Sequence, residues 1–197
     1  KPKNAAETNV PIKVKVWDFA VPTKMQAKTA FAFFDYEFGA WYGKGLSHEQ
    51  KLEWYDFLLQ HRISPTNIYS NSSVPTMEDI PFCAERGMNA FTLACTWYKD
   101  EKELDKMAEW MREYETFLKA NGWWDMPYIY GFDELGPDKF QELRDTYGGI
   151  KKRFPDLKTM TTIAPQPELK GAVDIWVPLT SNYVHEVAEQ YRQGGDD

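Results

Sequence analysis

The sequence alternates short apolar runs with longer amphipathic stretches, a pattern typical of α/β proteins. Apolar runs that predict strands cover residues 30–34, 67–69, 90–95, 128–132, 158–163 and 173–177. Apolar residues recur at helical spacing in between, which predicts helices over residues 47–62, 76–87, 101–120, 138–154 and 185–193. Successive strand–helix–strand units predict a parallel sheet with right-handed connections.

The number of expected strands favours a barrel over a nucleotide-binding sheet. The chain has no G-x-G-x-x-G motif and no phosphate-loop glycines. A TIM-type (β/α) barrel has eight strands and about 250 residues, whereas we expect six strands in these 197 residues. We therefore expect residues 29–197 to form a barrel truncated after about six βα units. Residues 1–28 are expected to be a linker or the tail of an upstream domain, with Val14–Trp17 as a short strand.

The composition excludes some classes of partner and favours another. A net charge of −7 argues against nucleic acid, because no basic stripe is available to neutralise phosphates. No apolar run is long enough for a membrane helix, so no membrane span is expected. Aromatic residues make up 16% of the chain and include eight tryptophans. Most of them are expected in the core, but their flat faces also suit sugar rings, which favours a carbohydrate ligand.

The cysteines and histidines do not predict a metal or a cofactor. Cys83 and Cys95 lie in expected buried elements and are interpreted as free thiols. The three histidines are scattered, and no His, Cys and carboxylate cluster has metal-ligand spacing.

The stretch Y-I-Y-G-F-D-E places two carboxylates, Asp133 and Glu134, directly after a buried strand. Catalytic residues of parallel α/β folds gather where strands end and loops begin. Polar or aromatic side chains also follow the first, third and sixth expected strands, namely Asp35, Trp97, Asn182 and Tyr183. A helix cap or a surface turn would explain any one of these residues. A cap explains one carboxylate, however, and not an adjacent pair.

The adjacency of the two acids narrows the chemistry. Ordinary glycosidases hold two carboxyl groups apart across the sugar, whereas neighbours on a regular strand point to opposite faces. Asp133 and Glu134 can therefore converge only if the end of the strand curls. Substrate-assisted hydrolysis suits neighbouring acids, because the sugar's own 2-acetamido group is the nucleophile. One carboxylate then orients the acetamido nitrogen, and the other exchanges protons with the leaving oxygen and with water.

Several segments of the chain resemble the catalytic domain of glycoside hydrolase family 123. They are T-A-F-A-F-F-D-Y, L-L-Q-H-R-I-S-P, R-G-M-N-A-F, Y-I-Y-G-F-D-E and V-D-I-W-V-P-L-T-S-N-Y, within residues 28–193. The resemblance implies a TIM-type barrel after an upstream β-domain and retaining, substrate-assisted release of terminal β-linked N-acetylgalactosamine. It implies that Asp133 stabilises the oxazolinium intermediate and that Glu134 is the general acid/base. The family continues past residue 197 into the last barrel strands.

The resemblance also suggests the cellular location and the glycan partner of the protein. It implies an exported bacterial protein, periplasmic or extracellular, with an oligosaccharide or glycolipid as the glycan partner. The residues do not separate N-acetylgalactosamine from N-acetylglucosamine, and a non-catalytic carbohydrate-binding barrel stays open as an alternative.

Five further residues are candidates for contact with the substrate. Trp97 is a candidate hydrophobic floor, Tyr183 a candidate donor to the acetamido carbonyl, and Asn182 a further contact. Arg62 is a candidate partner for a carboxylate below the pocket, although a helix C-terminus also favours arginine. Asp35 is the candidate nucleophile if the enzyme, and not the substrate, supplies one.

Overall fold

A computed structural model describes residues 3–4, 6, 9–22 and 24–196 of the chain. Its strands are β1 (Phe91–Cys95), β2 (Pro127–Tyr130), β3 (Lys158–Thr161) and β4 (Ile175–Trp176). The α-helices are α1 (Glu37–Tyr42), α2 (His48–Gln60), α3 (Ile80–Glu85), α4 (Glu101–Ala120), α5 (Phe140–Arg153) and α6 (His185–Gln193). Three short 3-10 helices are η1 (Pro137–Lys139), η2 (Pro167–Leu169) and η3 (Thr180–Asn182).

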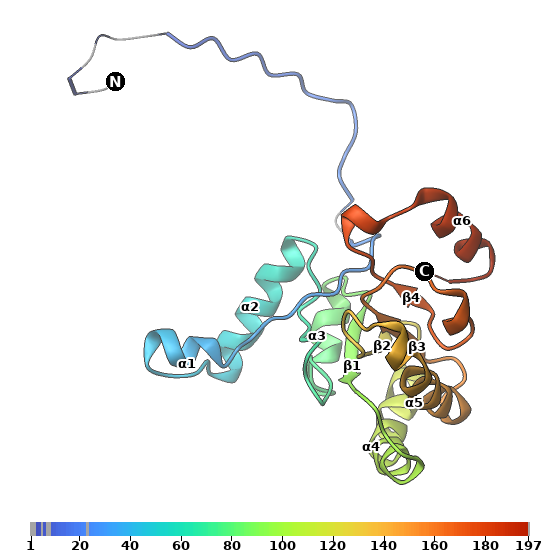
Figure 1. Ribbon diagram of the computed structural model, residues 1–197. Helices are drawn as coiled ribbons and strands as arrows, with labels where there is room; N and C mark the ends of the chain where they lie inside the picture. Colours follow the sequence, from blue (N-terminus) through green and yellow to red (C-terminus); the bar gives the residue numbers. More distant parts are fainter. Residues whose placement is uncertain (1–2, 5, 7–8, 23, 197) are drawn as a thin grey trace.

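The four strands form one parallel sheet in the order β1-β2-β3-β4, the same as their order in the sequence. Each strand is hydrogen-bonded to the next one, and helices α4 and α5 connect the first three (Figure 1). All carboxyl ends therefore lie along one edge of the sheet, as expected for a parallel α/β fold. The strands expected at residues 90–95, 128–132, 158–163 and 173–177 are confirmed, but each is shorter than expected. Strand β2 begins one residue earlier, at Pro127, and leaves Gly131 and Phe132 outside.

The two faces of the sheet are covered differently. Helices α4 and α5 bury one face through a large core that includes Leu93, Ile129, Met111 and Tyr147. The opposite face carries a smaller cluster, which consists of Ala90, Cys95, Tyr128, Tyr130 and Met160. Ala30, Ile68 and Ile175 pack against that cluster and are themselves partly buried. A pocket of about 670 Å³ opens on this second face, between the segment 26–31 and the sheet.

The strands expected at residues 30–34 and 67–69 are wrong. The two segments share one isolated antiparallel bridge, between Ala32 and Asn67. Two backbone hydrogen bonds hold it, from Phe33 N–H to the Thr66 carbonyl and from Ile68 N–H to the Phe31 carbonyl. Phe31 is 51% exposed, so the run is not buried on both faces. The bridge is isolated, so neither segment has the continuous ladder of hydrogen bonds that defines a strand.

The expected helices are found, with corrections at their ends. Ser47 caps α2 in a capping box with Gln50, as its S-x-x-Q pattern predicted. Thr76 is not the N-cap of α3, because that helix begins at Ile80 after Asp79. Pro81 explains the shift, since proline is tolerated in the first turn of a helix but not further inside. The short helix α1 was not expected.

The glycine pair inside α5 reflects close packing of two helices. A Cβ on Gly149 would lie 2.4 Å from Leu104 Cδ1 of α4, whereas one on Gly148 would meet nothing within 4 Å. Gly149 therefore lets α5 approach α4, and Gly148 has no such role.

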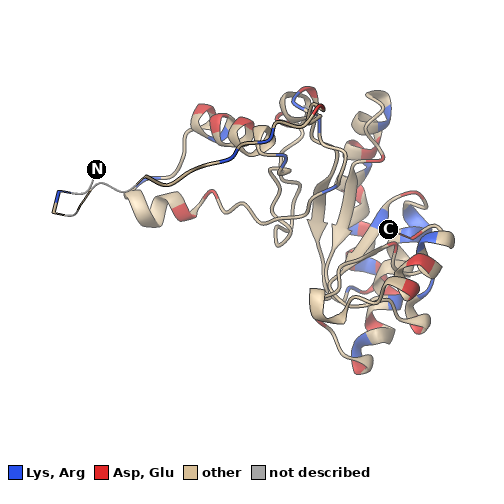
Figure 2. Cartoon of the chain, turned by 90° about the horizontal axis from the view of Figure 1, so that it is seen from above, with Lys and Arg blue, Asp and Glu red and all other residues tan. Residues whose placement is uncertain are grey.

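Residues 9–22 run away from the rest of the molecule as an extended, exposed segment (Figure 1). The short strand expected at Val14–Trp17 is wrong, because no ladder partner lies beside it among the described residues. Figure 2 shows the charged residues on helices and loops, while the strands are almost free of charge. None of the helices in the described part combines the length and the hydropathy that a membrane crossing requires.

Candidate active site at the end of strand β2

The backbone turns sharply after β2, where the two neighbouring acids lie. Phe132 has a φ of 55° and Glu134 a φ of 48°, so two non-glycine residues adopt left-handed conformations within three positions. Such conformations are uncommon and cost about 1–3 kcal/mol each. They end the regular strand, so the rule that neighbours point to opposite faces no longer applies to Asp133 and Glu134.

Close packing fixes the start of this turn. A Cβ on Gly131 would lie 1.7 Å from the carbonyl oxygen of Thr96, so no other residue fits there. The hydroxyl of Tyr147, on α5, lies 3.1 Å from the Gly131 carbonyl oxygen and 2.6 Å from that of Met160. Thr161 Oγ1 donates to the carbonyl of Phe132 at 2.7 Å. Strands β1 and β3 and helix α5 therefore all hold the turn.

Thr162 ties the two acids together. Its hydroxyl donates to Asp133 Oδ1, and its oxygen accepts the backbone N–H of Glu134 at 2.9 Å. One side chain from the end of β3 thus orients the carboxylate of Asp133 and the backbone of Glu134. Asp133 is half-buried, whereas Glu134 is exposed.

The groups around Asp133 are neutral. Burial, together with the charge of Asp133, raises the pKa of the Cys95 thiol to about 11. Burial and then Asp133 raise the pKa of Tyr130 well above its ordinary value. Both groups therefore keep their protons at neutral pH. None of the ion pairs among the described residues involves Asp133, and no metal-binding group of three His, Cys, Asp or Glu side chains is found among them.

A pocket of about 370 Å³ opens beside the turn. Glu134, Thr162 and Asn182 line it, together with Leu135, Phe140, Gln166 and Leu179. Trp97, which comes after β1, is 52% exposed and lies edge-on to Phe132, with ring centroids 6.0 Å apart. The structure thus brings Glu134 and Asn182 together in the lining of this pocket. Asp133 is not a lining residue, but Thr162 joins it to Glu134, and Trp97 lies next to the turn.

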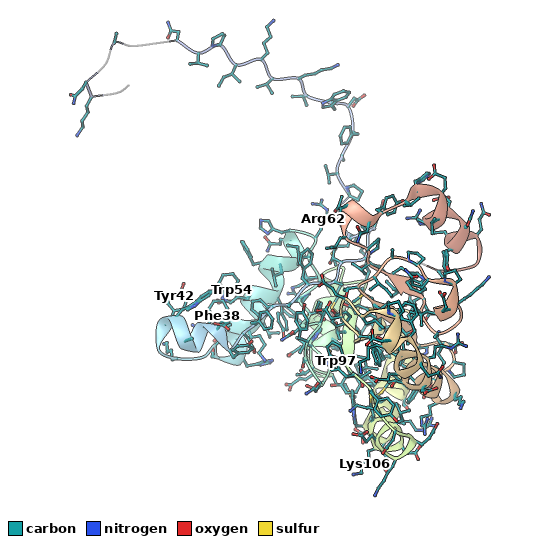
Figure 3. All side chains as sticks on the ribbon, viewed as in Figure 1. Phe38, Tyr42, Trp54, Arg62, Trp97 and Lys106 are labelled. Atoms are coloured by element: carbon teal, nitrogen blue, oxygen red, sulfur yellow. The ribbon has the colours of Figure 1, made fainter. Side chains whose placement is uncertain are left out.

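The other candidate residues lie elsewhere. Tyr183 lines a neighbouring pocket between β4 and α6, and its hydroxyl lies 3.3 Å from His185 Nδ1. Asp35 pairs with Lys51 of α2 at 3.4 Å. The Arg62 guanidinium donates to the carbonyl of Pro22, and Figure 3 shows Arg62 well away from Trp97. No contact joins Asp35 or Arg62 to Asp133 or Glu134 among the described residues.

Sequence reasoning missed two residues next to the acids, Thr162 and Tyr130. Thr162 stands in the run M-T-T-I at the end of an expected strand, where a hydroxyl would reach the neighbouring strand end. Tyr130 stands in the same apolar strand as Tyr128, so nothing in the sequence distinguishes its hydroxyl as a group next to the acids.

Comparisons with known proteins leave the family of this chain open. No protein-family model and no curated protein matches the sequence.

Proposed function

We propose that this chain carries the catalytic residues of a retaining β-N-acetylhexosaminidase that uses substrate-assisted hydrolysis. Asp133 accepts a hydrogen bond from the acetamido N–H of the sugar and so stabilises the oxazolinium intermediate. Glu134 protonates the leaving oxygen and then activates water. Terminal β-linked N-acetylgalactosamine on an oligosaccharide or glycolipid is the proposed substrate, in line with the resemblance of the sequence segments.

The observation that carries this proposal is the turn at residues 131–134. Two left-handed residues and the Thr162 hydroxyl bridge are an unusual way to end a strand. Backbone strain of this kind collects at functional sites, where the surrounding structure holds it in place. A helix cap does not explain it, because η1 begins at Pro137 and α5 at Phe140, beyond the turn.

The different environments of the acids fit their separate roles. Asp133 is half-buried and is held by a neutral hydroxyl, which suits a carboxylate that orients a bound group. Glu134 is exposed and lines the open pocket, which suits exchange of protons with a leaving group and with water.

We also propose that the sheet is part of the wall of a TIM-type barrel. The segment 66–70 lies beside β1, through bonds from Thr92 N–H to Thr66 Oγ1 and from Cys95 N–H to the Ser70 carbonyl. The segment 31–33 lies beside residues 66–68 in turn. The spatial order 31–33, 66–70, β1, β2, β3, β4 is also the order in the sequence, as it is around a (β/α) barrel. The one bridge between the first two segments is antiparallel, so in this structure the parallel wall extends over β1 to β4.

Replacement of each acid tests the function. Asp133→Asn and Glu134→Gln should each lower kcat on an aryl β-N-acetylgalactosaminide by about 100-fold or more. Asp156→Asn is the matched control, because it removes an exposed acid at the opposite end of β3. Near-normal turnover in either active-site variant contradicts the proposal. Binding of the free sugar without hydrolysis would favour a carbohydrate-binding module instead.

A further inference from the structure

The two tyrosines of strand β2 differ in the hydrogen bonding of their hydroxyl groups. Tyr128 and Tyr130 lie on the same face of the sheet and are 3% and 0% exposed. The Tyr128 hydroxyl accepts a hydrogen bond from Thr92 Oγ1 at 3.0 Å. The Tyr130 hydroxyl is buried and makes no hydrogen bond of ordinary geometry within the described part of the chain. Buried polar groups without a partner are rare and require a reason.

The groups around the Tyr130 hydroxyl supply a reason for its missing hydrogen bond. Asp133 and Thr162 lie beside it, and the ring of Tyr69 meets the Tyr130 ring edge-on at 5.7 Å. Cys95 and Tyr147 are the other titratable groups that interact with this cluster, and burial raises the pKa of each, so both stay neutral. Tyr130 also stays protonated, because burial and Asp133 raise its pKa. The hydroxyl is therefore a donor next to the Asp133 carboxylate that makes no hydrogen bond of ordinary geometry.

We propose that Tyr130 is a positioning residue for Asp133, and that its hydroxyl donates to the Asp133 carboxylate when the acetamido group of the substrate binds. Thr162 already donates to Oδ1, which leaves Oδ2 for Tyr130. The two hydroxyls together fix the plane of the carboxylate and stabilise its charged form. This inference rests on the proposed function, since it assigns a partner to the acid that orients the sugar.

The substitution Tyr130→Phe removes the hydroxyl alone. Because kcat reports ionisations in the enzyme–substrate complex, its acid limb should move to higher pH in this variant. A hydrogen bond to a charged group predicts a movement of about one to two pH units. The limb moves to higher pH because the carboxylate loses a hydrogen-bond donor that stabilises its charged form, and it then takes up a proton at higher pH. A purely structural role for Tyr130 would leave this limb in place.

Tyr128→Phe is the matched control on the same strand and face. It breaks the bond with Thr92, so its melting temperature should fall while the acid limb of kcat stays. Tyr130→Phe breaks no hydrogen bond of ordinary geometry within the described part of the free protein, so its melting temperature should stay close to that of the wild type. An unchanged acid limb in Tyr130→Phe, with the melting temperature retained, overturns the proposal.

A second measurement separates this proposal from the proposed function. If the wild type hydrolyses no aryl β-N-acetylhexosaminide, the proposed function fails. The Tyr130 hydroxyl proton, assigned by NMR through its absence in Tyr130→Phe, then decides the role of Tyr130. A resonance that shifts in Asp133→Asn shows that the hydroxyl lies beside the carboxylate, as the positioning role requires, and one that does not shift overturns that role.

Discussion

The turn at residues 131–134 and the segment 30–34 are both short, apolar-flanked stretches, yet they are held very differently. Four residues from neighbouring elements fix the turn, namely Thr96, Tyr147, Thr161 and Thr162. Two backbone hydrogen bonds hold the segment 30–34 against residues 66–68, and its Phe31 is half-exposed. Local sequence alone predicted a strand for the segment and did not predict the conformation of the turn. Hydrogen bonds from neighbouring elements fix the backbone of the turn, whereas ring contacts of Phe33 and Phe34 hold much of the segment 30–34.

The largest expected effect comes from breaking the turn at its tightest point. Gly131→Ala places a methyl group against the Thr96 carbonyl oxygen, a backbone atom that cannot move aside. We expect a loss of more than about 4 kcal/mol of unfolding free energy, or failure to fold. Chemical denaturation monitored by circular dichroism measures it.

Gly148→Ala is the matched control for that substitution. Its Cβ meets nothing within 4 Å and lies in the interior of α5, so alanine should stabilise the protein by about 0.5–1 kcal/mol. Equal stabilities of the two variants would show that the turn can relax, which contradicts the rigid arrangement of residues 131–134.

A smaller effect is expected from Thr162→Val, which keeps the shape of the side chain and removes its hydroxyl. The Asp133 carboxylate loses one donor, and the Glu134 N–H loses its acceptor. We expect a loss of about 1–3 kcal/mol of unfolding free energy, together with lower kcat on the aryl N-acetylgalactosaminide. Thr116→Val, on the exposed side of α4, is the control for the loss of a threonine hydroxyl. Unchanged kcat in Thr162→Val would show that the bridge does not orient the acids.

The smallest effect concerns the contact between helix α2 and the start of helix α3. His48 of α2 lies 2.6 Å from the buried Asp79 Oδ1, and this hydrogen bond raises the pKa of His48. A raised pKa stabilises the folded state fully below the unfolded value of about 6.5. That contribution is lost as the pH rises through the folded pKa.

His48→Gln should therefore remove a pH dependence of stability that the wild type shows above about pH 6.5. Melting temperatures of both proteins across this range measure it. Parallel curves for the wild type and His48→Gln would mean that the pair contributes nothing.

The fold could be predicted from the sequence where an apolar pattern runs over a long helix, or where strands and helices that follow each other in the chain also lie next to each other. The α4 face, with Leu104, Met107 and Met111 buried, is a direct consequence of helical spacing. The parallel order of β1 to β4 is expected from the alternation of strands and helices. The apolar run at residues 30–34 gave a wrong prediction, because the same pattern suits a strand and an irregular segment that packs through its aromatic rings.

The site could be predicted in part. The position of Asp133 and Glu134 at a strand end was readable, because burial of Y-I-Y-G-F places the next two residues at the carboxyl edge of the sheet. The left-handed backbone at Phe132 and Glu134 was not readable, since neither residue type favours that conformation. Nor were the contacts of Thr162 and Tyr130, which depend on how neighbouring strand ends meet in space.

The most direct test of the central claim compares two substrates that differ at C2. Wild-type protein should hydrolyse an aryl β-N-acetylgalactosaminide and leave the corresponding aryl β-galactoside nearly untouched, because the galactoside lacks the acetamido nucleophile. Comparable kcat/KM values for the two substrates would contradict substrate assistance and would assign the nucleophile to the enzyme.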